Sequence, residues 1–125
     1  MKKIAIIDDE PDICEGISEL LKDAGYETIV AYRGKDGLDL VIEQKPDLVI
    51  LDIALPDLDG TIVYEKIRKH PDPAVKDVKV IFLTALAMNA PEQFAGIDRP
   101  HYTIISKPVR FELIQKEIER LLALS

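Results

Sequence analysis

Four short runs of largely apolar residues divide the chain, and each run gives way abruptly to polar residues. The runs cover residues 4–7, 48–51, 80–83 and 103–105. Short continuous runs that are rich in Val and Ile are typical of strands covered on both faces, as in a parallel sheet. Residues 26–32 supply one further strand. The pattern therefore predicts a parallel sheet whose strands carry their polar chemistry at one end.

Apolar residues at helical spacing occupy the segments that follow these strands. The first such segment begins after Pro11 and stops at Gly25, where a left-handed residue ends many helices. The second must end before Pro46, and the third ends near His70 and Pro71. The apolar positions that define the four helices are Ile13, Ile17, Leu20, Leu21, Ala24, Leu38, Val41, Ile42, Ile62, Val63, Ile67, Phe111, Ile114, Ile118, Leu121 and Leu122. Because strands and helices alternate, we expect an α/β fold with a doubly wound, five-stranded parallel sheet.

Composition limits the classes of protein that fit this pattern. With 125 residues, 47% of them hydrophobic, the chain has the size and core of one domain, and we expect residues 1–125 to form a single domain. A net charge of -7 disfavours direct binding to nucleic acid or to an anionic membrane surface. No segment is apolar for long enough to span a bilayer. The single cysteine, Cys14, excludes an internal disulfide and fits a reducing compartment, so we expect a cytoplasmic location.

Acidic side chains gather at the ends of the first and third strands. Asp8 and Asp9 follow the first apolar run, and Asp52 follows the third. In a doubly wound sheet the ligand crevice lies beyond the carboxyl ends of the strands, so these carboxylates should meet there. Two carboxylates about 4 Å apart repel by roughly 4 kcal/mol at an effective dielectric of 20, and a divalent ion with oxygen ligands relieves the repulsion. The sequence therefore predicts a Mg²⁺ site.

A lysine and a threonine at two other strand ends suggest a phosphoryl position beside this metal. Lys107 follows the last strand and supplies a positive charge for a phosphoryl oxygen, while the hydroxyl of Thr84 can donate to another. An aspartate carboxylate can attack phosphorus when such groups stabilise the charge that develops. Asp52 is the candidate nucleophile because it stands singly at the centre of the set.

Each of these residues also has a simpler interpretation when it is taken alone. Residues 9–12 suit an ordinary helix N-terminus with acidic residues and an early proline. Asp52 precedes a segment rich in turn-forming residues, Lys107 is compatible with a plain strand exit, and Thr84 is a common strand residue. Their joint position at the ends of strands in one predicted sheet favours the phosphoryl site.

At these positions the chain resembles the receiver domain of response regulators in two-component signalling. The resemblance implies a flavodoxin-like fold with strand order 2-1-3-4-5, and phosphorylation of Asp52 by a sensor histidine kinase or phosphotransfer protein. It covers nearly the whole chain in the family's order. The residues that carry it are Asp8-Asp9, Asp52 with Leu55-Pro56 and Asp59-Gly60, Thr84-Ala85, and Lys107-Pro108.

The same resemblance implies a role for each site residue. Magnesium would be bound directly by Asp9, Asp52 and the main-chain carbonyl of Ala54, with Asp8 acting through a bound water. Lys107 would contact the phosphoryl group, its bond to the next residue would be cis, and Thr84 would move toward the phosphoryl group as the switch. The switch would alter a surface for a downstream effector protein or output domain. Such a domain is not an enzyme, apart from slow self-catalysed phosphorylation and dephosphorylation.

The chain departs from the family pattern in two places. Three residues before the lysine the family usually has Tyr or Phe, and this chain has Ile104, so Tyr102 on the same strand face is a possible substitute. Residues 85–100, where the fourth helix of the family belongs, are interrupted by Pro91, Gly96 and Pro100. We expect at most a short helix there, within residues 89–96.

Two other functions are compatible with parts of the sequence. A receiver-like interaction domain that acts without phosphorylation is suggested by Ile104 and the broken helix. A phosphatase with an aspartate nucleophile, as in the haloacid-dehalogenase-like enzymes, usually has a second Asp two residues after the first. Here that position is Ala54, which predicts poor turnover.

Overall fold

The computed structural model describes residues 1–85 and 102–123, which contain the five predicted strands, the four predicted helices and one further short helix. The elements in chain order are β1 (Lys3–Ile7), α1 (Pro11–Asp23), β2 (Glu27–Ala31), α2 (Gly34–Gln44), β3 (Leu48–Asp52), α3 (Gly60–Arg68), α4 (Pro73–Lys76), β4 (Lys79–Thr84), β5 (Tyr102–Ser106) and α5 (Phe111–Leu122). No helix in these two ranges is long and apolar enough to cross a lipid bilayer.

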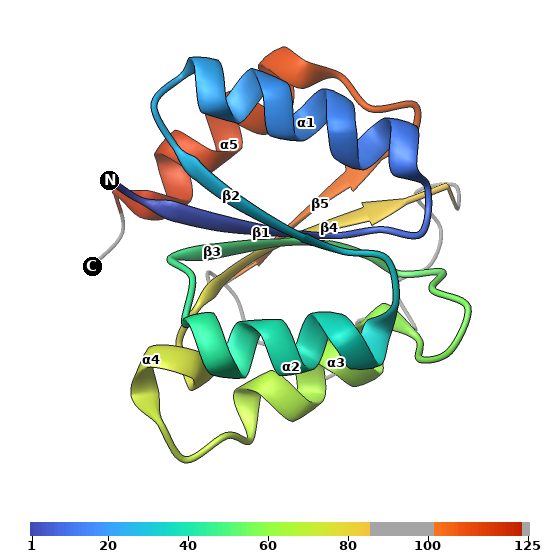
Figure 1. Cartoon of the computed structure of the whole chain (residues 1–125), viewed down its shortest axis with the longest axis vertical. Helices are drawn as coiled ribbons and strands as arrows, with labels where there is room; N and C mark the ends of the chain where they lie inside the picture. Colours follow the sequence, from blue (N-terminus) through green and yellow to red (C-terminus); the bar gives the residue numbers. More distant parts are fainter. Residues whose placement is uncertain (86–101, 124–125) are drawn as a thin grey trace.

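The strands form one parallel sheet in the order β2-β1-β3-β4-β5, which confirms the predicted doubly wound fold. The register aligns the carboxyl ends of the strands: Ile7 pairs with Ala31, Asp52 with Leu83, and Thr84 with Ser106. These ends lie along one edge of the sheet, on the right of Figure 1, where the arrowhead of β4 points. The segments that leave this edge are the ones predicted to carry the site.

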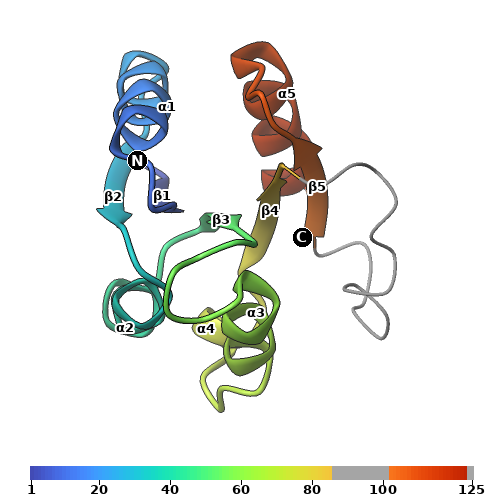
Figure 2. The same cartoon turned by 90° about the vertical axis from the view of Figure 1, so that its right-hand side faces the viewer.

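Helices cover both faces of the sheet. Helices α1 and α5 lie on one face, and α2, α3 and α4 lie on the other (Figure 2). Neighbouring residues of a strand serve opposite faces: Ile4 and Ile6 belong to the core beneath α1 and α5, whereas Ala5 and Ile7 belong to the core beneath α2 and α3. All four are fully buried. A strand buried on both sides needs the unbroken apolar run seen in the sequence.

The ends of the first helix match their sequence signals. Helix α1 begins at Pro11 and is followed by Gly25, whose φ of 96° is the left-handed conformation predicted there.

The strand after α1 is shorter than predicted, because the amide of Tyr26 donates to the carbonyl of Leu21 and so belongs to the helix end. The prediction for residues 26–32 was therefore too long at that end, and β2 starts at Glu27.

One element was not predicted, and some predictions lie outside the described residues. Helix α4 has only 4 residues, too few to show a helical period, although Asp72 caps it and Pro73 opens it. The short helix predicted within residues 89–96 and the side chain of Tyr102 lie outside the described part of the chain.

Candidate functional site

Four strand ends bring the predicted site residues to one edge of the sheet. Asp8 directly follows β1, Asp52 and Thr84 are the last residues of β3 and β4, and Lys107 directly follows β5. Two backbone hydrogen bonds extend the strand pairing into the site: the amide of Asp8 donates to Ala31 O over 3.1 Å, and that of Lys107 donates to Thr84 O over 2.7 Å. Backbone hydrogen bonds thus fix the positions of the Cα atoms from which the side chains of Asp8 and Lys107 extend.

Lys107 connects this set through its ammonium group. Its Nζ lies 3.0 Å from Glu10 Oε1, 3.2 Å from Asp8 Oδ2 and 3.4 Å from Asp52 Oδ2. The side chain must reach past β4 to do so, because β4 separates β5 from β3 in the sheet. Only 12% of it is exposed, and the peptide bond from Lys107 to Pro108 is cis, as the resemblance implies. Burial alone lowers the pKa of Lys107, but the hydrogen bond with Glu10 and the charges of Asp8 and Asp52 raise it above its ordinary value.

Asp8 is fully buried and only partly satisfied. Its Oδ1 accepts a hydrogen bond of 2.9 Å from the amide of Glu10. Its Oδ2 is within ion-pair distance of Lys107, yet it accepts no well-aligned hydrogen bond from any described residue. Burial raises the pKa of Asp8 despite the opposing effects of the Glu10 amide and Lys107. A buried carboxylate oxygen without a hydrogen bond is an available acceptor for a cation or for a water bound to one.

Asp52 is also buried, with 2% of the residue exposed. Its Oδ1 accepts from the amide of Ala54 over 3.2 Å, and its Oδ2 faces Lys107. Burial raises the pKa of Asp52, and the negative charge of Asp8 raises it further, while Lys107 opposes both. The hydrogen bond from the Ala54 amide is a turn contact, and the ion pair with Lys107 places Asp52 in the predicted site. Asp52 therefore has both of the roles that the sequence suggested.

The oxygen atoms near the end of β1 have the chemistry of a magnesium site. One carboxylate oxygen from each of Asp8, Asp9 and Glu10 lies within 4.8 Å of the others. Asp8 is buried, whereas the other two are exposed. Hard oxygen donors with room for retained waters suit Mg²⁺, and the unsatisfied Asp8 Oδ2 belongs to the same group. The residues present fit the ion that the sequence predicts.

Glu10 is the site residue that the sequence interpretation missed. It is the N-cap residue of α1, but its side chain makes no capping hydrogen bond. Its Oε1 instead accepts a hydrogen bond from Lys107 Nζ over 3.0 Å. The simple interpretation of residues 9–12 as an acidic helix cap is therefore incomplete. The only sign of a site role for Glu10 in the sequence was its position directly after Asp8 and Asp9. That position did not identify Lys107 as its partner.

The loop after Asp52 is held tightly against the strand end. The amide of Gly60 donates to Ile53 O over 2.7 Å, and Asp59 caps α3 by accepting from the amide of Thr61 over 2.8 Å. Asp57 in the same loop accepts from the amides of Gly34 (2.7 Å) and Lys35 (2.9 Å) at the start of α2. The loop is thus attached to two helices. These contacts fix the backbone that carries Asp52.

Cys14 lies beside the site but is not suited to nucleophilic chemistry. It is 1% exposed, and its Sγ donates to the carbonyl oxygen of Asp8 over 3.3 Å. Burial, followed by the charge of Asp8, raises the pKa of Cys14 to about 12. A thiol with that pKa is protonated at neutral pH and inert. Cys14 is therefore a packed, unreactive residue beside the site.

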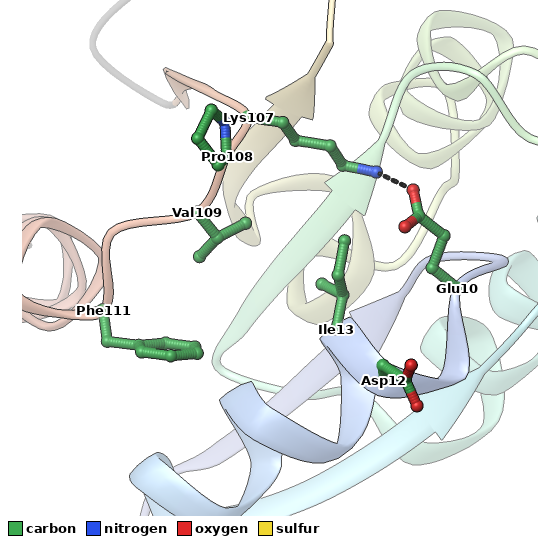
Figure 3. Close-up of a pocket in the computed structure, with 7 residues that line it drawn as sticks. All are labelled: Glu10, Asp12, Ile13, Lys107, Pro108, Val109 and Phe111. Carbon is green, nitrogen blue, oxygen red and sulfur yellow. Dashed lines mark hydrogen bonds and ion pairs between the residues drawn. The ribbon is translucent and has the colours of Figure 1, made fainter.

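An open pocket of about 550 Å³ adjoins the site between α1 and the segment that follows β5 (Figure 3). Lys107 and Glu10 reach toward each other at one rim, and Ile13, Val109 and Phe111 contribute apolar walls. The pocket therefore combines apolar walls with the charged Lys107–Glu10 pair.

Comparison with known proteins gives this arrangement a family. The family model of the response regulator receiver domain matches residues 4–119. The chain belongs to this family. Receiver domains of two-component systems interact with histidine kinases and output effectors, bind Mg²⁺ at an acidic pocket and are generally not enzymes.

One curated relative shares the domain over nearly its whole length. This receiver domain is 34% identical over 122 residues to the DNA-binding dual master transcriptional regulator RpaA of Synechocystis sp., a match that covers 98% of this chain and 49% of that protein. The chain therefore spans about half the length of this curated relative.

Two solved structures illustrate the shared fold. A CheY-like response regulator receiver domain protein from Methanospirillum hungatei superposes with a TM-score of 0.83 at 30% identity, covering 98% of this chain and 94% of that one. The response regulator TrrA of Thermotoga maritima, crystallised in complex with Mg²⁺-BeF, gives a TM-score of 0.79 at 34% identity, covering 97% and 99%. Both likenesses agree with the sheet order of this receiver domain.

Proposed function

We propose that this receiver domain accepts a phosphoryl group on Asp52 from a sensor histidine kinase or a phosphotransfer protein. One observation carries the proposal: a single lysine, Lys107, is paired with two buried carboxylates, Asp8 and Asp52, at the ends of neighbouring strands. Burying two carboxylates with one shared cation costs stability, and groups held at such a cost cluster at functional sites. Membership of the receiver family supports phosphoryl acceptance as that function.

The proposed reaction needs a nucleophile and groups that stabilise charge. A carboxylate oxygen of Asp52 attacks phosphorus and forms an acyl phosphate, while the bond from phosphorus to the histidine nitrogen breaks and the imidazole leaves with the electron pair. A carboxylate nucleophile needs no general base, because it carries no proton to remove. Lys107 stabilises the negative charge on the phosphoryl oxygens. The amide of Ala54 orients the Asp52 carboxylate through its hydrogen bond.

The proposed magnesium ligands are Asp9, Asp52 and the main-chain carbonyl of Ala54, with Asp8 acting through a bound water. When bound, the ion would neutralise carboxylate charge and polarise the phosphoryl oxygens. Support comes from the hard oxygen donors at the end of β1 and from the unsatisfied Asp8 Oδ2. A metal-bound water is the natural donor for that oxygen.

Thr84 is the proposed switch, and Ile104 stands at the position where the family usually has the aromatic residue that accompanies it. Ile104 occupies the aromatic position and packs, half-buried, against the core cluster that contains Phe82 and Tyr64. We expect phosphorylation to draw in Thr84 and the residues that follow it, because the new group adds charge and three strong acceptor oxygens. The altered surface would then bind a downstream effector protein or output domain.

The remaining parts of the proposal concern the whole chain. We propose that residues 1–125 act as a single receiver unit in the cytoplasm. The net charge of -7 argues against direct contact with nucleic acid or an anionic membrane. Catalytic activity is limited to slow self-catalysed phosphorylation and dephosphorylation. A phosphatase with an aspartate nucleophile usually has a second Asp two residues after the first, and here that position is Ala54.

The test is phosphorylation by a small donor. The protein is incubated with acetyl phosphate and Mg²⁺, and its intact mass is recorded beside those of Asp52→Asn and Asp57→Asn. Asp57 is a matched control because it lies in the same loop but bonds to backbone amides of α2. We expect the native chain and Asp57→Asn to gain one phosphoryl group that is labile to base, and Asp52→Asn to gain none.

Other outcomes identify other functions. An adduct on Asp52→Asn at the native level would refute Asp52 as the acceptor. No adduct on the native chain, with magnesium binding demonstrated by titration, would favour an interaction domain that acts without phosphorylation. Continuous release of inorganic phosphate with multiple turnovers would favour a phosphatase.

A further inference from the structure

Lys107 is held by three carboxylates, and the shortest of these contacts is made by Glu10, which belongs to the carboxylate group at the end of β1 but is not one of the proposed magnesium ligands. Glu10 Oε1 lies 3.0 Å from Lys107 Nζ, compared with 3.2 Å for Asp8 and 3.4 Å for Asp52. The three side chains differ in exposure: Glu10 is 56% exposed, and Asp8 and Asp52 are 0% and 4% exposed. Glu10 therefore holds the ammonium group from the solvent side.

The ammonium group of Lys107 donates hydrogen bonds to Glu10 and Asp52, whereas Asp8 Oδ2 lies within ion-pair distance without a well-aligned hydrogen bond. When Asp52 carries a phosphoryl group, Lys107 must move with its ammonium group to the new oxygens. Asp8 gains another cation when magnesium binds. The hydrogen bond to Glu10 then restrains Lys107, because Glu10 is not a proposed ligand of the ion and keeps its attraction for the ammonium group. This reasoning rests on the proposed function of Asp52 and Lys107.

We propose that Glu10 is a positioning residue that draws Lys107 toward the solvent side of the site and competes with the incoming phosphoryl group for its ammonium. Figure 3 shows the geometry: Glu10 from the start of α1 and Lys107 from the segment after β5 extend toward each other at the rim of the pocket. The pair separates when Lys107 turns to a phosphoryl oxygen.

The decisive experiment compares Glu10→Gln with Glu15→Gln in the full chain. Glu15 is an exposed residue of α1, so its substitution removes the same charge from the same helix without touching Lys107. The initial rate of acyl phosphate formation with acetyl phosphate and Mg²⁺ is measured by intact mass. We expect Glu10→Gln to be about two- to five-fold faster than the native chain, the range for a partly exposed ion pair. Glu15→Gln should match the native rate.

A double-mutant cycle separates competition for Lys107 from a general charge effect. Both substitutions are repeated in a Lys107→Met background, in which Glu10 has no ammonium to hold. If Glu10 acts through Lys107, the gain from Glu10→Gln disappears there. An equal gain in both backgrounds would show that Glu10 acts only through its charge, and it would overturn the proposal.

A second measurement needs neither metal nor phosphodonor. The ammonium protons of lysine are observed by ¹H–¹⁵N correlation spectra only when hydrogen bonds slow their exchange with water. We expect a Lys107 signal in the metal-free native chain and in Glu15→Gln, and its loss or broadening in Glu10→Gln. If the native chain is phosphorylated but Glu10→Gln changes neither the phosphorylation rate nor the Lys107 signal, the role of Glu10 is refuted and the proposed function stands. If the native chain is not phosphorylated at all, the proposed function is refuted as well.

Discussion

Gly60 is the first residue of α3, and substitution of it by alanine should disturb the phosphoryl acceptor directly. A Cβ atom at this position would overlap the carbonyl oxygen of Asp52 and lie 2.8 Å from Ile53 Cα. The amide of Gly60 also donates to Ile53 O over 2.7 Å, so the start of α3 is pressed onto the end of β3. The obstructing atoms belong to the backbone and cannot rotate away as a side chain could. The helix and the strand end must therefore separate.

The structure sets the size of the effect. Overpacking in a well-packed region costs about 1–3 kcal/mol, and a collision with backbone belongs in the upper half of that range. Alanine favours a helix interior over glycine by about 1 kcal/mol, but the first helical residue gains little of this. We expect Gly60→Ala to lower the free energy of unfolding by about 2 kcal/mol. Because Asp52 is displaced, we also expect a phosphorylation rate at least about ten-fold lower, since misplacement of reacting groups by an ångström can cost more than this.

Gly25→Ala is the matched control. Gly25 has a φ of 96°, and a Cβ added there would meet no atom within 4 Å beyond its chain neighbours, so the substitution strains the backbone without a collision. The cost is about 1–2 kcal/mol. The residue follows the far end of α1, about 20 Å from the site at 1.5 Å per helical residue. Urea titration should show both variants destabilised, and acetyl phosphate kinetics should show only Gly60→Ala slowed. Equal rates in the two variants, or an unchanged urea midpoint for Gly60→Ala, would refute this reasoning.

Three further predictions concern charge. Lys107→Met should lower the free energy of unfolding by about 3 kcal/mol without magnesium, because two buried carboxylates lose their cation; an unchanged urea midpoint would contradict the pairing. Mg²⁺ at about 100 times its Kd should add about 2.7 kcal/mol, seen as a higher Tm, and an equal gain in Asp9→Asn would exclude Asp9 as a ligand. Hydrogen bonds from the amides of Lys35 and Gly34 hold the pKa of Asp57 below 3.8, so its charge stabilises the fold above that pH and the contribution is lost as the pH falls through the folded-state pKa. The stability difference between the native chain and Asp57→Asn should therefore be present at neutral pH and narrow below pH 3.8; a constant difference would contradict this sign.

Much of the fold was predictable because burial on both faces leaves a visible pattern. The first four residues of β3, 48–51, are buried on both faces and are all apolar, and the strand ends at the first charged residue, Asp52. The short helix α4 leaves no such pattern, since 4 residues do not complete a second turn. Tyr26 was assigned to the strand over residues 26–32, yet its amide donates to Leu21 O and completes the end of α1. Tertiary hydrogen bonding decided that boundary.

The site was predictable to the extent that strand ends determine it. Asp8, Asp52 and Lys107 meet because parallel strands in one register end at one edge of the sheet. Their meeting could therefore be predicted once each residue was placed at the end of a strand in that sheet. The partner of Glu10 could not be predicted in this way. Its side chain reaches a residue 97 positions away, and its choice between capping α1 and pairing with Lys107 depends on distances that no local pattern encodes. The attachment of Asp57 to α2 is hidden for the same reason.

The resting site is thus a set of carboxylates that Lys107 already neutralises in part, which bears on how phosphorylation can act as a switch. The phosphoryl group does not gain the whole interaction energy of Lys107, because the lysine must first give up contacts at 3.0 to 3.4 Å. Only the difference between the old and new contacts is available to shift the conformational equilibrium. A resting partner such as Glu10 reduces that difference, and magnesium increases it by satisfying the carboxylates that Lys107 leaves. The strength of the switch should therefore depend on the competition for one ammonium group.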